Sequence, residues 1–170
     1  MGLFDKLFKK EQEVQLPAVN AGDDAIVAVA DGEMIDVTTV SDEVFAQKMM
    51  GESTAFRFAG DKVILCAPAN GTLSVLFPTG HAYGITRNDG VELLVHCGIN
   101  TVEANGDGFR LLGKKQGDSV RAGDPVVEVD LKKLGAKYDM STILIVTNPN
   151  GKEISFAAPR YVKRGETVTA

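Results

Sequence analysis

Short runs of apolar and β-branched residues recur along most of the chain, and clusters of glycine, asparagine and aspartate separate them. Runs of this length between turn residues are typical of strands, and eighteen glycines supply the turns. The pattern predicts an all-β protein, an antiparallel β-sandwich or barrel-like fold. The predicted strands are residues 25–30, 63–67, 72–77, 82–87, 91–97, 126–130 and 143–147.

Helical periodicity is confined to short segments. Residues 42–50 (DEVFAQKMM) place apolar side chains at helical-turn spacing, and residues 131–137 follow Asp130, a residue type that favours the start of a helix. We therefore expect short helical segments within a β fold.

The N-terminus carries a different pattern. Residues 1–10 (MGLFDKLFKK) place four apolar residues on one helical face and three lysines on the other. Because so short a helix is marginal in water, it is either a frayed tail or an interfacial anchor attracted to anionic lipid. Residues 11–24 have the composition of a linker, so we expect an N-terminal segment and linker over 1–24 and a single domain over 25–170.

Two weak internal repeats join a turn to a strand. Residues 28–32 (AVADG) resemble residues 67–71 (APANG), and residues 120–126 (VRAGDPV) resemble residues 162–168 (VKRGETV). Repeats of this kind predict a duplicated β unit.

Composition and charge exclude several classes of protein. The 170 residues include 18 Lys and Arg against 23 Asp and Glu, so the net charge of −5 leaves no general basic surface for a nucleic acid. No apolar run approaches the length of a membrane span, and no secretory signal is present, so we expect a cytoplasmic protein. Cys66 and Cys97 lie in apolar runs and are predicted to be buried, reduced thiols.

Both histidines of the chain fall in one predicted hairpin. His81 and His96 flank the turn sequence Arg87–Gly90, and a loop centred near residues 88 and 89 would place His81 directly opposite His96. Two imidazoles at cross-strand distance can share one small anion. Thr79 lies two residues before His81, where its hydroxyl can fix the tautomer of an imidazole.

Several chemistries compete for this pair of histidines. The sequence contains no G-x-S-x-G elbow, Walker A motif or complete dinucleotide fingerprint. A zinc-dependent peptidase-like β protein is one alternative, although catalytic zinc needs about three protein ligands. A lipoyl-like or biotinyl-like module is another, but the AGDPVVEVD turn has no lysine at its tip. Phosphoryl transfer needs only the two histidines that are present, one to accept the phosphoryl group and one to stabilise the added charge. The alternative to any chemistry is that both are ordinary surface residues.

Longer matches surround the two histidines. The segments TGHAYGI (79–85) and GVELLVHCGINTV (90–102) resemble the two signature histidine segments of the glucose-specific enzyme IIA components of the bacterial phosphoenolpyruvate:sugar phosphotransferase system. The resemblance covers nearly all of residues 25–147. Further matching segments are MGLFDKL, SDEVFAQKMMG, APANGTL and VEANGDGF.

The resemblance implies an antiparallel β-sandwich of the duplicated hybrid motif type that acts as a phosphotransferase component. His96 would accept a phosphoryl group from the histidine-containing phosphocarrier protein and pass it to a cysteine of a sugar permease IIB domain. His81 would hydrogen-bond the phosphoryl group, and Thr79 would hold His81. No metal or nucleotide is then required, although a bound partner could complete a zinc site at His81 and His96.

The family also implies regulatory binding of other proteins by the unphosphorylated form, and a location at the inner face of the membrane if residues 1–10 bind lipid. Its docking surface maps to apolar positions that would serve equally well as core. Asn100 stands where the family usually has aspartate, whereas Asp42 matches an acidic position, so we expect altered docking. The predicted partner-binding residues are Asp42, Val44, Phe45, Met49, Met50, Phe77, Leu94, Asn100 and Val102.

Overall fold

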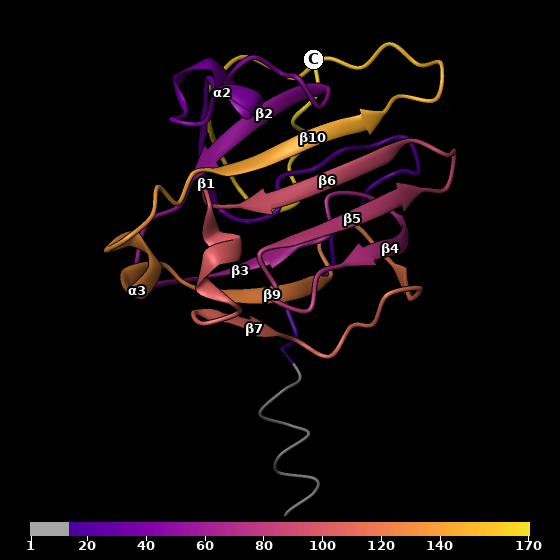
Figure 1. Cartoon of the computed structure of the whole chain (residues 1–170). Helices are drawn as coiled ribbons and strands as arrows, with labels where there is room; N and C mark the ends of the chain where they lie inside the picture. The colour runs from indigo at the N-terminus through magenta and orange to yellow at the C-terminus, as the bar shows by residue number, and fades with distance from the viewer. Residues whose placement is uncertain (1–13) are drawn as a thin grey trace, which may run out of the picture.

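Two antiparallel sheets form the body of the molecule (Figure 1). The computed structural model describes residues 14–170, and the amphipathic helix predicted for residues 1–10 lies outside that range. The larger sheet has the order β11-β1-β2-β10-β6-β5-β4-β8, and the smaller has the order β3-β9-β7. The predicted all-β class is confirmed. No helix within residues 14–170 is long and apolar enough to span a membrane.

The elements are short, as the spacing of turn residues requires. The helices are η1 (Val37–Thr39), α2 (Glu43–Ala46), η2 (Thr101–Ala104) and α3 (Leu131–Gly135). The strands are β1 (Gly32–Ile35), β2 (Glu52–Arg57), β3 (Lys62–Cys66), β4 (Gly71–Leu76), β5 (Ala82–Arg87), β6 (Glu92–Cys97), β7 (Phe109–Leu111), β8 (Ser119–Val120), β9 (Pro125–Asp130), β10 (Thr142–Asn148) and β11 (Tyr161–Val162).

Six of the seven predicted strands are found, and the strand predicted for residues 25–30 is wrong. That segment is buried, but its hydrogen bonds alternate between neighbours: Val27 N donates to Pro68 O at 2.8 Å and Ala28 N donates to Glu166 O at 2.8 Å. The helix predicted for residues 42–50 is also too long. It ends at Ala46, and Lys48 lies in the left-handed region at φ 54°, which an α-helix cannot continue through.

The main core fills the space between the two sheets, and a second apolar cluster lies beneath α2. Tyr83, Phe56 and Leu65 are fully buried in the main core, where each large side chain contributes about 1.5–3 kcal/mol. Cys66 and Cys97 are buried and free, as predicted, and burial raises the pKa of each thiol to about 12. The second cluster contains Val37, Val40, Phe45, Ala55, Ile99, Ile143 and Ile145.

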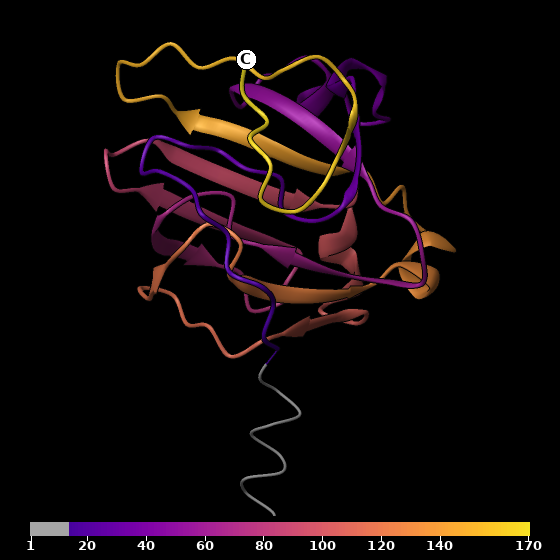
Figure 2. The same cartoon turned by 180° about the vertical axis from the view of Figure 1, so that it is seen from behind.

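The two sequence repeats make equivalent backbone contacts, which supports the predicted duplication. Gly123 N donates to Ala67 O at 2.8 Å, and at the matching positions Gly165 N donates to Ala28 O at 3.0 Å. Figure 2 shows the C-terminal segment running beside the N-terminal part of the body. The terminal repeat therefore closes the fold by pairing with the first.

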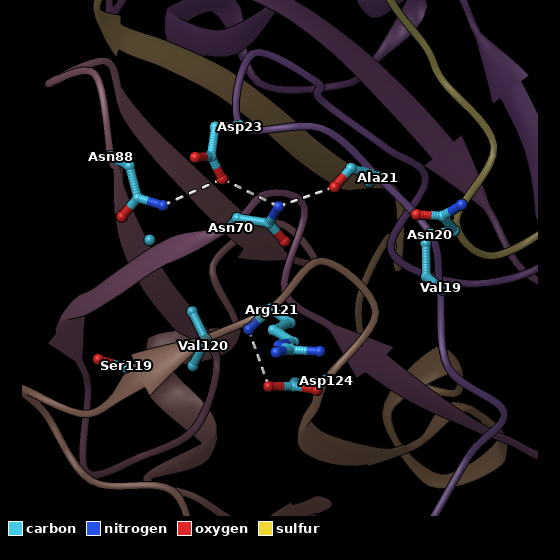
Figure 3. A pocket seen from close by; sticks show the side chains of 11 residues that line it. Val19, Asn20, Ala21, Asp23, Asn70, Asn88, Ser119, Val120, Arg121 and Asp124 are labelled. Atoms are coloured by element: carbon cyan, nitrogen blue, oxygen red, sulfur yellow. Dashed lines mark hydrogen bonds between the residues drawn. The ribbon is translucent and has the colours of Figure 1, made fainter.

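Equivalent side chains reinforce these contacts. Asn70 Oδ1 accepts a hydrogen bond from Ala122 N at 2.8 Å, and Asp31 Oδ1 accepts one from Arg164 N at 2.7 Å. Asn70 also donates to Ala21 O at 2.9 Å beside a polar cavity of about 570 Å³ (Figure 3). Part of the predicted linker is thus fixed against the turns of the repeat.

A buried cation fixes the turn between β5 and β6. The Arg87 side chain is 3% exposed, and its guanidinium makes two hydrogen bonds to the Asp89 carboxylate, at 2.8 and 2.6 Å. A third hydrogen bond joins Arg87 to Asp24 O at 2.7 Å. The hydrogen bonds from Arg87 hold the pKa of Asp89 well below its usual range, although partial burial opposes them.

Replacing Asp89 with Asn should lower the free energy of unfolding by about 2 kcal/mol at pH 7, because a buried guanidinium loses its counter-charge. Because the pKa of Asp89 is lower in the folded than in the unfolded protein, the stability difference between wild type and variant is full above about pH 4. The difference declines as the pH falls toward and through the pKa of Asp89 in the folded protein. Urea unfolding of both proteins over pH 2–7 measures this. Asp118→Asn, which alters only a turn contact to Lys115 N, is the control.

Candidate functional site

The two histidines lie where β6 ends and β5 begins, two neighbouring interior strands of the larger sheet whose ends Figure 1 shows side by side. The predicted register is wrong by one residue, since His96 pairs with Ala82. The loop has three residues, and the third, Gly90, adopts φ 89°. Arg87 N donates to Val91 O, so the hairpin is centred on Asp89.

The imidazole rings nevertheless meet. Their centroids are 5.4 Å apart in an edge-to-face arrangement. His81 precedes the first residue of β5 and follows Gly80, whose φ of 77° takes the chain out of regular strand alternation. A Cβ at position 80 would lie 2.9 Å from Phe109 Cβ, so the backbone there is held close to β7. The predicted proximity of the rings is therefore observed, although it does not arise from direct cross-strand pairing.

Thr79 fixes the His81 ring. Its Oγ1 lies 2.6 Å from His81 Nδ1, which is the contact that the sequence predicted. When the hydroxyl donates to Nδ1, the ring proton of neutral His81 lies on Nε2. His81 is buried, and desolvation lowers its pKa, so this neutral form is favoured.

His96 is held between the other histidine and an aromatic ring. Its ring centroid lies 4.9 Å from that of Phe45, and its Nδ1 is buried without a hydrogen-bond partner in the described part of the chain. Burial lowers the pKa of His96 and the nearby His81 lowers it further, while the Gly98 backbone and the Asp42 charge act in the opposite direction. A neutral imidazole has one protonated nitrogen and one nitrogen with a free lone pair, so with its proton on Nδ1 His96 would present Nε2 as a nucleophile.

The turn after His96 is held by residues of a distant segment that the sequence analysis did not identify. Gly98 has φ 80°, and a side chain there would overlap Thr101 and lie 3.1 Å from Met140 Sδ. Gly98 N donates to Ser141 O at 3.0 Å, and Ile99 N donates to Asp139 O at 2.8 Å. These partners are about 40 positions away in sequence, so local pattern carries no signal for them.

The predicted partner-binding residues divide into four groups. Asp42 caps α2 by accepting a hydrogen bond from Val44 N at 2.8 Å. Phe45 is buried and belongs to the core beneath the site, which is the core alternative that the sequence left open for these positions. Leu94 is partly buried beside it. Asn100 is exposed, with φ 61°. The exposed apolar members are Val44, Met49, Met50, Phe77 and Val102, which we call the apolar rim.

The site gives little support to a resident metal. Residues 14–170 contain no group of three or more His, Cys, Asp and Glu side chains able to hold a metal ion. The two histidines would need ligands from another molecule to complete a zinc site. The zinc-peptidase alternative therefore has no support among the described residues.

Comparison with known sequences agrees with this geometry. A family model described as phosphoenolpyruvate-dependent sugar phosphotransferase system, EIIA 1, matches residues 24–151. The chain is 38% identical over 167 residues to the glucose-specific EIIA component of Staphylococcus aureus (strain COL), covering 97% of this chain and 95% of that protein. Identity to the corresponding component of Haemophilus influenzae is 38% over 171 residues, covering 99% of this chain and 96% of that one.

Two further relatives bear on fold and context. The glucose-specific EIICBA component of Staphylococcus carnosus is 38% identical over 149 residues, and this chain spans 22% of its length. The structure of glucose permease IIA from Mycoplasma capricolum superposes with a TM-score of 0.79 at 37% identity, covering 85% of this chain and 93% of that one. The resemblance found in the histidine segments is thus confirmed across most of the chain.

Replacing His81 with Gln should raise the pKa of His96, because the variant removes the charge that opposes protonation of the second ring. NMR titration of the His96 Cε1 proton measures the change. Asn88→Ala, at the far end of the same hairpin, should leave the His96 pKa unchanged. A His96 pKa that stays constant or falls in His81→Gln contradicts this electrostatic coupling.

Proposed function

The chain belongs to the EIIA 1 family of the phosphoenolpyruvate-dependent sugar phosphotransferase system, and from this premise we propose that His96 carries a phosphoryl group between two partner proteins. The observation that supports His96 most directly is the burial of its Nδ1. Since that nitrogen cannot reach another protein, Nε2 is the atom that we assign to the transfer.

The transfer forms one bond and breaks one. The Nε2 lone pair of His96 attacks the phosphorus of a phosphohistidine on the histidine-containing phosphocarrier protein, and the donor P–N bond breaks with its electron pair returning to the donor ring. In the second step a cysteine thiolate of a sugar permease IIB domain attacks the same phosphorus. His96 then regains its free electron pair.

His81 stabilises the charge that arrives on His96. With Thr79 bound at Nδ1, the Nε2–H of His81 is free to donate to a phosphoryl oxygen. The ring centroids of His81 and His96 are 5.4 Å apart, which places this donor beside a group carried by His96. Hydrogen bonds to an anionic phosphoryl group are stronger than those between neutral groups, and the anion in turn favours protonation of His81. His81 therefore assists transfer without itself carrying the group.

The apolar rim is the surface that we propose for docking. Its flexible methionines suit a face that must fit a phosphocarrier, a IIB domain and regulated proteins in turn. We place this activity in the cytoplasm, with residues 25–170 as the functional domain and residues 1–24 as an N-terminal segment and linker, of which residues 1–10 could contact the membrane. Neither step requires a metal or a nucleotide, although a docked partner could add ligands to a zinc ion at the two histidines.

His96→Gln should abolish acceptance of the phosphoryl group, whereas His81→Gln should accept it and pass it on more slowly, by about tenfold or more. The measurement is intact mass at alkaline pH after incubation with phosphoenolpyruvate, enzyme I and the phosphocarrier, each omitted in turn. Peptide mapping locates the added group. Acceptance by His96→Gln at the wild-type rate would refute the assignment.

Val102→Asp should raise the KM for the phosphocarrier by about tenfold while leaving the maximal rate within about twofold, because it places a charge in the apolar rim without touching either histidine. Tyr161→Asp is the matched control, since Tyr161 is exposed to a similar degree on the edge strand β11. Equal KM values in the two variants would contradict the proposal that the apolar rim binds the phosphocarrier.

A further inference from the structure

Asp139 organises a turn that faces the strand end carrying His96. One carboxylate oxygen, Oδ1, accepts hydrogen bonds from Ser141 N at 2.9 Å and from Ser141 Oγ at 2.7 Å. An aspartate that accepts from the residue two positions later fixes the backbone between them in a turn. The direction of the carbonyl groups in residues 139–141 is therefore set by this carboxylate.

Two of those carbonyl groups hold the backbone that follows His96. Asp139 O accepts from Ile99 N at 2.8 Å, and Ser141 O accepts from Gly98 N at 3.0 Å. Gly98 lies beside the His96 ring and influences its protonation. The turn shaped by Asp139 thus fixes the backbone immediately after the residue proposed to carry the phosphoryl group.

The second carboxylate oxygen reaches the other side of the site. Asp139 Oδ2 accepts a hydrogen bond from Ser41 Oγ at 3.1 Å, although the two residues are 98 positions apart. Ser41 immediately precedes Asp42, which caps α2 and lies close enough to His96 to influence its charge. The same helix places the Phe45 ring against His96.

The contacts through the 139–141 backbone and the contact through Ser41 therefore both lead to the His96 ring. We propose that Asp139 is a positioning residue for phosphoryl transfer, acting through the Gly98–Ile99 backbone and through Ser41 to hold the His96 ring and α2 in fixed relation. This inference rests on the proposed function of His96. It assigns Asp139 no contact with the phosphoryl group itself.

The charge state of Asp139 suits this role. Partial burial acts to raise the pKa of Asp139, but hydrogen bonds from Ser141 and Ser41 and the nearby charge of Arg57 outweigh it and lower the pKa. The carboxylate is then ionised at neutral pH and accepts all three hydrogen bonds. An asparagine amide nitrogen, which only donates, cannot replace both oxygens.

The chain provides a matched control for the experiment. Asp36 Oδ1 accepts from Thr38 N at 2.9 Å and Thr38 Oγ1 at 2.7 Å, in the same kind of exposed turn, but its turn makes no hydrogen bond to Gly98 or Ile99. Asp36→Asn thus removes an equivalent carboxylate. Ser141→Ala is the complementary variant, because it removes a hydrogen bond to Asp139 and keeps the charge.

The test compares steady-state transfer from the phosphocarrier with the NMR spectrum of His96 in the free, full-length protein. In Asp139→Asn we expect about a tenfold lower maximal rate, a KM within about twofold of wild type, and a displaced His96 ring resonance. Ser141→Ala should show a smaller change in the same direction, and Asp36→Asn should match wild type in all three quantities.

Two results would overturn the inference. A raised KM with an unchanged His96 resonance would mean that the Asp139 carboxylate contacts the partner directly. Wild-type values for Asp139→Asn in both measurements would mean that the turn does not act on His96. Failure of wild type to accept any phosphoryl group would instead refute the proposed function, and the His96 resonance would still decide whether Asp139 positions the ring.

Discussion

The buried guanidinium of Arg87 must be neutralised, and the residue that neutralises it lies in the same turn. By binding Asp89, Arg87 fixes the loop that sets the register of β5 and β6. That register places the start of β5 beside the end of β6, with Ala82 opposite His96. The relation of His81 to His96, at the opposite end of the hairpin, therefore depends on an ion pair that takes no part in the chemistry.

Duplication supplies the scaffold, whereas the candidate site occurs once. Asn70 and Asp31 accept matching backbone hydrogen bonds in the two repeats, so both halves close in the same way. The two histidines, in contrast, both belong to a single hairpin. The described part of the molecule thus combines a repeated framework with one candidate site at the ends of two strands, which agrees with the view that function resides in sites grafted on folds.

Sequence pattern was sufficient for most of the strands and for singling out the candidate site residues, but not for geometry set by distant contacts. Six strands follow from alternation and turn chemistry. The Thr79–His81 contact and the nearness of the histidines were also predicted, but the rings meet without the direct cross-strand pairing from which their nearness was inferred. The register failed because Gly90 adds a third residue to the loop, a choice that tertiary context decides. Asp139 was missed because its partners, Gly98, Ile99 and Ser41, lie far from it in sequence.

The burial of both cysteines has a consequence for the fidelity of the relay. The proposed acceptor of the phosphoryl group is a thiolate on another protein, so an accessible thiolate on this chain would be a competing acceptor. Cys66 and Cys97 are 0% and 1% exposed, and with pKa values raised to about 12 they remain protonated in the cell. The burial of both thiols therefore removes them as competing acceptors of the phosphoryl group that we propose His96 carries.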